Sequence, residues 1–450
     1  MDKIKQLNER KATLKNAGKT IRAEIAALTD EASFVELAAF SFSKDQFYGE
    51  DAQGEGVVTG FATVGGYPYY IVAQNFEVSY GGLSKANCEK IAKTLNAAEK
   101  NRTPVIYLLQ SYGVRVGEGV NVMEGISELL MKATQLKGSV LQFAVVLGEA
   151  YGSTAALCSV CDCVFFTGKS VLSLSSPFVV SAKAGKNVKK EEVGGYHALK
   201  NSLLPAILVK DTKEVASKIL QISDFVNIPI IDAELNTAVP ALNKKCGAAQ
   251  IAEILENGVE LGANSCPELK TVLARVGGVA IAAAIFDDVK LNASNVKKLK
   301  NFAEFAACYG LPVVTFVDCV GVEPTAEVND STLLKEICEY LSILDTVDVK
   351  ISVVTGKAIG LGYSLFVAKS VGFDYTYAFA TAKIALFESA EGAEIEYANE
   401  KNANKEELRM LYADDNSDPI HAAKSGYLDE VIEPQFVKQY LIASLQTLIG

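Results

Sequence analysis

The fold is decided by the stretch 145–152, Val-Val-Leu-Gly-Glu-Ala-Tyr-Gly, which returns at 353–360 as Val-Val-Thr-Gly-Lys-Ala-Ile-Gly. The offset from 145 to 353 is 208 residues, and the same offset relates Pro-Val-Ile-Tyr-Leu at 104–108 to Pro-Val-Val-Thr-Phe at 312–316. A shared offset across separate stretches is typical of an internal duplication. The chain is therefore predicted to contain two copies of one unit.

Each half is predicted to alternate strands with helices. Short apolar runs at 69–73 and 280–285 favour buried strands, and amphipathic runs at 85–99 and 295–309 favour helices. Alternating β and α segments favour parallel strands covered by helices. A period of 208 residues is far too long for a solenoid repeat. We therefore predict an α/β protein with two duplicated domains, residues 1–240 and 241–450.

The composition fits two ordinary domains and excludes several other classes of protein. The chain has 450 residues, and 49% of them are hydrophobic, which suffices for two cores. Its net charge of −11 is spread over interspersed acids and bases, so we expect no nucleic-acid partner. Nine scattered cysteines do not form a disulfide framework, and the first thirty residues lack the apolar segment of a secretory signal. We expect a cytoplasmic protein without disulfides.

The repeated stretch ends in Gly-x-Ala-x-Gly, a pattern typical of a strand that turns sharply into a helix. Such a turn leaves backbone N–H groups unpaired at a helix N-terminus, where the helix dipole also favours negative charge. It can therefore hold an oxyanion, or its glycines can serve only for tight packing of strand and helix. Two copies at equivalent positions favour the anion-binding interpretation, although common descent would also preserve a purely structural turn.

Further stretches resemble one known family. They lie at 54–60 (Gly-Glu-Gly-Val-Val-Thr-Gly), 72–76 (Val-Ala-Gln-Asn-Phe), 189–195 (Lys-Lys-Glu-Glu-Val-Gly-Gly), 311–318 (Leu-Pro-Val-Val-Thr-Phe-Val-Asp) and 418–434. In this order they are similar to the carboxyltransferase β-subunits of acetyl-CoA and propionyl-CoA carboxylases and related decarboxylases. The resemblance covers nearly the whole chain. It implies an α/β fold of two tandem crotonase-like domains of the ββα superhelix type, as in ClpP and crotonase.

The resemblance also implies a reaction and a site. A carboxylate would pass between N1-carboxybiotin and the α-carbon of an acyl-CoA, through a thioester enolate and the enolate of the biotin ureido group. Each oxyanion needs backbone donors, and each donor typically contributes about 10²–10³ in rate. The first domain of this family holds the acyl-CoA and the second holds biotin. The implied catalytic residues are Gly152 and Ser153 on the acyl-CoA side, and Gly360, Leu361 and Gly362 on the biotin side.

Several positions depart from the family pattern. A Ser-Gly-Gly-Ala-Arg stretch of the family is Ser-Tyr-Gly-Val-Arg at 111–115 here, and the glycine pairs of both turns are altered. The implied substrate-binding residues, in this stretch and after the second turn, are Ser111, Gly113, Arg115 and Ser364. Backbone donors survive a change of side chain when the turn keeps its shape. Activity is therefore expected, and a catalytically weakened structural subunit stays open as an alternative.

Three cysteines form a CxxCxC cluster that suggests a metal site. Cys158, Cys161 and Cys163 could bind zinc, but no further cysteine or histidine pair lies nearby to complete four ligands. Buried free cysteine is common in proteins. We therefore expect no metal in this chain.

Side-chain acid–base or nucleophilic catalysis has little support in the sequence. The chain has only two histidines, His197 and His421, and neither lies in a catalytic motif. The resemblance requires no side-chain base, because the biotin nitrogen can take the α-proton after carbon dioxide leaves. Ser153 could be a nucleophile, but it lacks a histidine at the spacing that serine peptidases use.

The partners follow from what the chain lacks. Neither the biotin-acceptor sequence Ala-Met-Lys-Met nor a Gly-rich ATP site is present. The resemblance therefore implies biotin on a separate carrier protein, a separate biotin carboxylase subunit, and assembly as a homo-hexamer. A related alternative is the α-subunit of an acyl-CoA decarboxylase, which can work with a membrane subunit. Several acyl groups and both directions of reaction fit this pattern.

Overall fold

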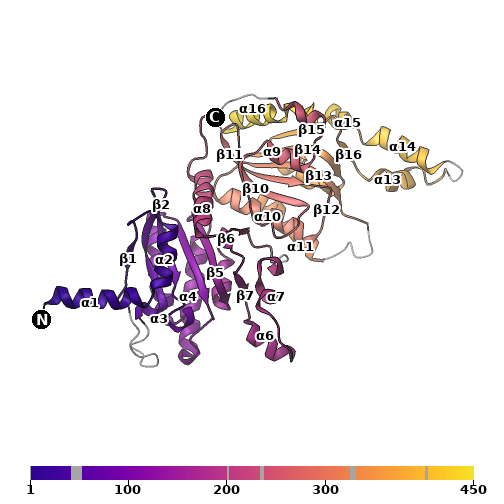
Figure 1. The fold of residues 1–450 in the computed structure, drawn as a ribbon. Helices are drawn as coiled ribbons and strands as arrows, with labels where there is room; N and C mark the ends of the chain where they lie inside the picture. Colours follow the sequence, from indigo (N-terminus) through magenta and orange to yellow (C-terminus); the bar gives the residue numbers. More distant parts are fainter. Residues whose placement is uncertain are drawn as a thin grey trace. The chain divides into compact units, whose positions relative to one another are not determined.

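The computed structural model describes residues 2–41, 53–199, 202–233, 238–324, 331–400 and 404–449. The chain forms two compact units, Met1–Ser223 and Asp224–Gly450, each with its own sheet (Figure 1). Helix α8 (Thr212–Asn227) crosses this division. The boundary predicted from the sequence, between residues 240 and 241, follows that helix. No helix in the described ranges has the length and apolar character needed to cross a membrane.

The first unit is built on a sheet with the strand order β1-β2-β3-β4-β5-β6-β8, and β7 pairs with β5 beside this path. From β3 to β8 the neighbouring strands are parallel. The strands are β1 (Val35–Leu37), β2 (Val57–Val64), β3 (Tyr67–Gln74), β4 (Val105–Ser111), β5 (Gln142–Tyr151), β6 (Cys163–Phe166), β7 (Val171–Ser173) and β8 (Ala206–Leu208).

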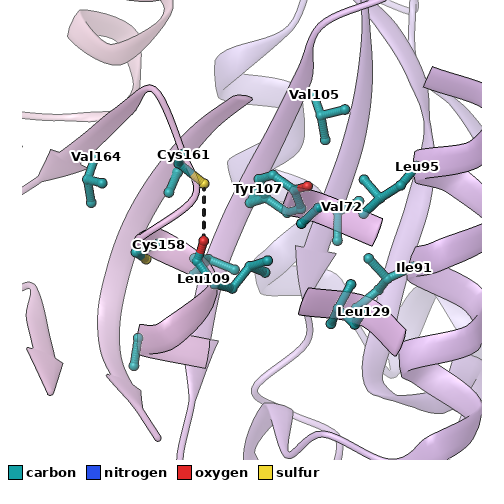
Figure 2. Close-up of a cluster of buried hydrophobic side chains, with 14 of the residues drawn as sticks. Val72, Ile91, Leu95, Val105, Tyr107, Leu109, Leu129, Cys158, Cys161 and Val164 are labelled. Atoms are coloured by element: carbon teal, nitrogen blue, oxygen red, sulfur yellow. Dashed lines mark hydrogen bonds between the residues drawn. The ribbon is translucent and has the colours of Figure 1, made fainter. Parts of the chain in front are cut away.

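The core of the first unit lies between this sheet and two long helices that pack side by side, α3 and α4. Ile91 on α3 and Leu129 on α4 are buried in the same cluster as Val72 and Tyr107 of the sheet (Figure 2). The helices of this unit are α1 (Lys3–Asn16), α2 (Lys19–Leu28), α3 (Lys85–Asn101), α4 (Val120–Leu136), α5 (Ser153–Cys158), α6 (Pro177–Ala184) and α7 (Lys190–Gly194).

The second unit repeats this plan. Its sheet has the order β17-β15-β14-β13-β11-β10-β9, with β12 beside β13 and β16 beside β14. The strands are β9 (Glu256–Glu260), β10 (Leu269–Val276), β11 (Val279–Phe286), β12 (Val289–Lys290), β13 (Val313–Gly321), β14 (Lys350–Ile359), β15 (Tyr375–Phe379), β16 (Lys383–Ala385) and β17 (Glu430–Ile432).

The helices of the second unit again include a packed pair, α10 and α11, in the place of α3 and α4. The helices are α9 (Ala248–Glu253), α10 (Ala293–Cys308), α11 (Ser331–Leu344), α12 (Leu361–Phe366), α13 (Ser389–Glu396), α14 (Lys405–Asn416), α15 (Pro419–Lys424) and α16 (Val437–Ile449). The predicted duplication is therefore visible in the order of both strands and helices.

Both sheets are mixed, which corrects the prediction of parallel strands. Strands β2 and β3 pair antiparallel, as do β10 and β11. Each hairpin turns through two glycines with positive φ, 56° and 85° at Gly65 and Gly66, and 54° and 83° at Gly277 and Gly278. Two consecutive residues with positive φ form the tight turn that suits a two-residue hairpin. The glycine pairs thus reverse the chain before the parallel part of each sheet begins.

Equivalent buried lysines show how closely the two units correspond. Lys90 on α3 donates to the carbonyls of Gly54 and Val57, at 3.0 Å and 2.7 Å. Lys298 on α10, 208 residues later, donates to two carbonyls of its own unit at 2.8 Å and 2.7 Å. In each unit a buried ammonium group therefore connects one helix, α3 or α10, to the backbone near the start of the first strand of the hairpin, β2 or β10.

Candidate active site

The first repeated stretch forms the end of β5 and the turn into α5. Gly152 precedes the helix with φ 64° and ψ −127°, a conformation that favours glycine. Its own N–H donates to the carbonyl of Ser173 at 2.9 Å. The N–H groups of Ser153 and Thr154 belong to the first turn of α5, where no intrahelical acceptor exists. Gly152, which was predicted as a donor, has its N–H engaged and sets the shape of the turn, whereas the N–H groups of Ser153 and Thr154 have no intrahelical acceptor.

The second repeated stretch has the same backbone shape between β14 and α12. Gly360 has φ 51° and ψ −118°, and its N–H donates to the carbonyl of Ala385 at 3.0 Å. Leu361 and Gly362 occupy the first helical positions. A Cβ atom on Gly362 would lie 3.0 Å from the sulfur of Cys319, so a larger residue there would press on β13. Gly360, which was predicted with them, has its N–H engaged, and the N–H groups of Leu361 and Gly362 have no intrahelical acceptor.

A cavity of about 550 Å³ adjoins the second turn, and Gly360 and Leu361 line it. Lys357 also lines the cavity, with its ammonium group 3.2 Å from carboxylate oxygens of both Asp288 and Glu388. Partial burial opposes a rise in the pKa of Lys357, but the two carboxylates outweigh it and raise this pKa above its ordinary value. The cavity therefore combines backbone donors with a protonated lysine.

The equivalent position in the first turn carries the opposite charge. Glu149, which lies 208 residues before Lys357, accepts a hydrogen bond from the hydroxyl of Tyr151 at 2.7 Å and one from Lys190 at 3.0 Å. Burial and the hydrogen bond to Glu149 raise the pKa of Tyr151 well above its usual range. Neither Glu149 nor Lys357 was predicted from the sequence. The aligned repeats already carry this reversal of charge, at the fifth residue of each stretch.

The residues predicted to bind substrate have different environments. Ser111 is buried, and its hydroxyl donates to the carbonyl of Gly113 and accepts from the N–H of Gly113. Arg115 is also buried, where its guanidinium donates to Glu55 at 2.8 Å. Ser364 is exposed on α12 and donates to the carbonyl of Gly360 at 3.3 Å. Ser111 and Arg115 shape the loop after β4, and direct contact of all four residues with substrate stays a prediction.

The cysteine cluster lies inside the core of the first unit. Cys158 and Cys161 belong to the same buried cluster as Leu109 and Val164 (Figure 2), and Cys163 is buried on β6. Burial raises the pKa of Cys158 to about 12 and the pKa of Cys161 and Cys163 well above the ordinary value. Zinc binds thiolates rather than thiols. Within the described ranges, no group of three metal-ligating side chains is placed to hold an ion.

Both histidines are exposed. His197 packs edge-on against Tyr196, with ring centroids 5.3 Å apart. His421 lies on α15, where its carbonyl accepts from Ser425. In the hydrogen bonds described for this chain, neither imidazole contacts a residue of the two turns.

Comparison with known proteins gives one consistent result. A family model described as carboxyl transferase domain matches residues 13–449. The chain is 26% identical over 491 residues to the methylmalonyl-CoA decarboxylase subunit alpha of Veillonella parvula, covering 99% of this chain and 96% of that protein. It is 28% identical over 464 residues to the methylmalonyl-CoA carboxyltransferase 12S subunit of Propionibacterium freudenreichii subsp. shermanii, covering 95% of this chain and 88% of that subunit.

A solved structure with the same fold is the transcarboxylase 12S hexamer with methylmalonyl-CoA bound. It aligns with a TM-score of 0.91 at 23% identity, covering 99% of this chain and 95% of the 12S chain. The two tandem crotonase-like domains predicted from the sequence are thereby confirmed, as is the resemblance to biotin-dependent carboxyltransferase subunits. With a family match that spans nearly all of its residues, the chain belongs to the carboxyl transferase domain family.

Proposed function

We propose that the chain is a carboxyltransferase subunit that moves a carboxylate between N1-carboxybiotin, carried on a separate protein, and the α-carbon of an acyl-CoA. The observation that carries this proposal is the pair of matching turns at Gly152 and Gly360, which have nearly equal φ and ψ. The reaction develops negative charge on two different oxygens, and the fold offers two turns with backbone donors.

In this proposal the first turn holds the thioester oxygen. The N–H groups of Ser153 and Thr154 would donate to that oxygen as the α-carbon loses its proton and the charge moves onto oxygen. These donors are fixed by the backbone before substrate binds, because Gly152 is held to Ser173. They therefore need no reorganisation when the charge develops.

The second turn would hold the ureido oxygen of biotin. Bound carboxybiotin supplies carbon dioxide and then a basic nitrogen for the α-proton. Leu361 and Gly362 would donate their N–H groups to the ureido oxygen, beside a cavity that Lys357 lines together with its partners Asp288 and Glu388. Glu149 stands at the equivalent place in the first turn, where it is paired with Lys190. The family resemblance, and not the local charge, supports biotin at the second turn and acyl-CoA at the first.

The partners in this proposal are a biotin carboxyl carrier protein and a biotin carboxylase subunit. The transcarboxylase 12S protein of known structure assembles as a hexamer, and we propose the same assembly for this chain. Acetyl-CoA and propionyl-CoA are the simplest acyl substrates to test. Since one relative is named a decarboxylase subunit, a decarboxylase direction with a membrane partner is the second candidate.

The test uses the purified protein with free biotin and malonyl-CoA or methylmalonyl-CoA. Transfer to biotin should produce acetyl-CoA or propionyl-CoA only when biotin is present, and liquid chromatography of the CoA esters measures it. Co-purification with a membrane subunit would support the decarboxylase alternative. Complete inactivity of a folded oligomer with every CoA ester would contradict the proposal and favour a structural subunit.

A further inference from the structure

Four aromatic side chains converge where the strands of the first unit reach the first turn. Phe76 and Tyr80 follow β3, Tyr112 follows β4, and Tyr151 ends β5 directly before Gly152. The rings of Tyr80 and Tyr112 are stacked, with centroids 5.6 Å apart and planes 10° apart. Phe76 meets both of them edge-on, and the ring centroid of Tyr151 lies 6.1 Å from that of Tyr112. We call these four residues the aromatic cluster.

The two stacked rings are largely accessible. Tyr80 is 63% exposed and Tyr112 is 51% exposed, although both belong to one continuous cluster. Exposed aromatic surface next to polar donors is characteristic of small-molecule sites, which lie at the carboxyl ends of parallel strands in α/β proteins. The cluster is therefore placed to contact a ligand that is held at the first turn.

The loops that carry the cluster are held rigidly. The N–H of Tyr112 donates to the carbonyl of Tyr80 at 3.1 Å, and Leu83 exchanges two backbone hydrogen bonds of 2.8 Å with Gly113 and Arg115. Tyr80 has φ 52°, a left-handed conformation that persists only when the surrounding structure enforces it. The stack is thus formed before any ligand binds, so binding does not require these rings to become ordered.

The position of the cluster selects one part of an acyl-CoA. A thioester oxygen at Ser153 places the acyl carbons beside the residues that flank the turn, and Tyr151 is one of them. The adenine of CoA is separated from the thioester by the whole pantetheine arm. Tyr151 itself is buried, so a ligand ring would meet the accessible Tyr112 beside it. A ring that touches Tyr112 next to the turn is therefore part of the acyl group.

We infer that the aromatic cluster binds the acyl group, and that the substrate is an acyl-CoA with a flat, aromatic or conjugated acyl substituent. This inference rests on the proposed function. A flat ring stacks on Tyr112, whereas a methyl or ethyl group covers little of its surface.

The reaction of such a substrate is balanced without another reagent. With an arylacetyl-CoA, the α-carbon loses a proton to the biotin nitrogen and forms a bond to carbon dioxide, while the N1–carboxylate bond of carboxybiotin breaks. The products are an arylmalonyl-CoA and biotin. The enolate of an arylacetyl thioester is planar and conjugated with its ring, so stacking is retained as the charge develops.

Binding in the absence of biotin tests this inference. Calorimetry would compare phenylacetyl-CoA with cyclohexylacetyl-CoA, which has the same size but a puckered saturated ring, and with propionyl-CoA. Phenylacetyl-CoA should bind about threefold to tenfold more tightly than cyclohexylacetyl-CoA, as expected for one added aromatic contact. Equal affinities for the flat and puckered rings would overturn the inference.

Variants assign the preference to the cluster. Tyr112→Gly should abolish the preference for the flat ring, and Tyr112→Phe should keep it. Tyr67→Ala is the matched control, because Tyr67 is also exposed but lies at the opposite end of β3. A preference that survives Tyr112→Gly would place the ring elsewhere. If the Tyr112→Gly protein does not fold, the Tyr112→Phe protein still tests the inference. Loss of the preference for the flat ring in a folded Tyr112→Phe protein would contradict stacking.

A transfer assay separates this inference from the proposed function. If the flat ring is preferred in binding but no CoA ester exchanges a carboxylate with biotin, the proposed function fails and the binding site stands. If carboxyl transfer occurs and kcat/KM is equal for phenylacetyl-CoA and cyclohexylacetyl-CoA, the proposed function stands and the inference fails.

Discussion

At the scale of single residues, the proposed catalysis depends on peptide N–H groups, so most side-chain substitutions leave the donors in place. Ser153 and Leu361 are the first helical residues after the two turns. Proline lacks an N–H and is well accepted at the first position of a helix. A proline at either position should therefore remove one donor and keep the helix.

Ser153→Pro should lower acyl-CoA carboxylation by about 10²–10³-fold, as for loss of one oxyanion donor. It should leave decarboxylation of free carboxybiotin without acyl-CoA unchanged, whereas Leu361→Pro should impair both reactions. Ser153→Ala, which keeps the N–H, is the control and should stay close to wild type. A Ser153→Pro protein that loses only the biotin reaction would reverse the assignment of the two turns.

The buried ion pair between Arg115 and Glu55 gives a second prediction. The exposed fractions of these side chains are 2% and 0%. Arg115→Met would leave a carboxylate buried without its main counter-charge and should lower the free energy of unfolding by about 3–5 kcal/mol in urea titrations. The double change of Arg115 to Met and Glu55 to Gln should recover much of that loss. Removing the exposed partner Lys405 from its pair with Glu394 should cost less than about 1 kcal/mol.

The sequence predicted the backbone of the site better than its side chains. Gly152 and Gly360 were predicted at the turns because glycine spacing reports directly on backbone conformation. The burial of Arg115 was not predicted, because its partner Glu55 is 60 residues away in the chain and no local pattern links them. The contact of Tyr112 with Tyr80 was not predicted for the same reason, because the two loops that carry these residues meet only in the folded unit.

At the scale of helices and strands, periodicity located the elements and side-chain caps set their ends. The helix predicted at 295–309 begins earlier, at Ala293, because Asn292 accepts hydrogen bonds from the N–H groups of Ser294 and Asn295. The prediction of parallel strands was wrong for the hairpins, because apolar periodicity does not report strand direction. The glycine pairs were the local signal of a reversal.

The buried lysine of α3 predicts a pH dependence of stability. Burial lowers the pKa of Lys90 from 10.5 to about 8 in the folded protein. Between these two pH values the unfolded chain binds a proton that the folded protein lacks, so stability should rise with pH by about 3 kcal/mol in total from this group. Below pH 8 the cost of burying the charge is present in full.

Urea titrations at pH 7.5 and 10 would measure this rise. Lys90→Met should make the change between these pH values smaller than in wild type. Lys93→Met, a substitution of an exposed residue on the same helix, should leave the change in stability between these pH values as in wild type. An identical pH dependence in the Lys90 variant and wild type would show that this ammonium group keeps an ordinary pKa.

At the scale of the whole molecule, two units of similar size each carry one proposed anion-binding turn. The family resemblance implies assembly as a homo-hexamer, so we predict that the protein is not a monomer. Sedimentation at micromolar concentration should show an oligomer, with six chains of 48.1 kDa as the expected species. A single species of the mass of one chain would contradict this prediction.

We also predict that the whole protein holds no stoichiometric metal. The cysteine thiols of the first unit are buried with raised pKa values, and backbone donors suffice for the proposed chemistry. Elemental analysis after dialysis against a chelator should find less than one zinc per ten chains, on the order of a contaminant. Retention of one zinc per chain would require Cys158, Cys161 and Cys163 to act as ligands.

The reversal from Glu149 to Lys357 at equivalent positions bears on how the two halves diverged after duplication. Peptide donors are inherited with the path of the main chain, and nearly any mutation of the residue that bears them leaves the donor in place. Natural selection could therefore hold the two turns constant while the neighbouring side chains drifted, even to opposite charge. One ancestral gene could in this way give rise to two pockets with different ligands, without an intermediate that lost its anion-binding groups.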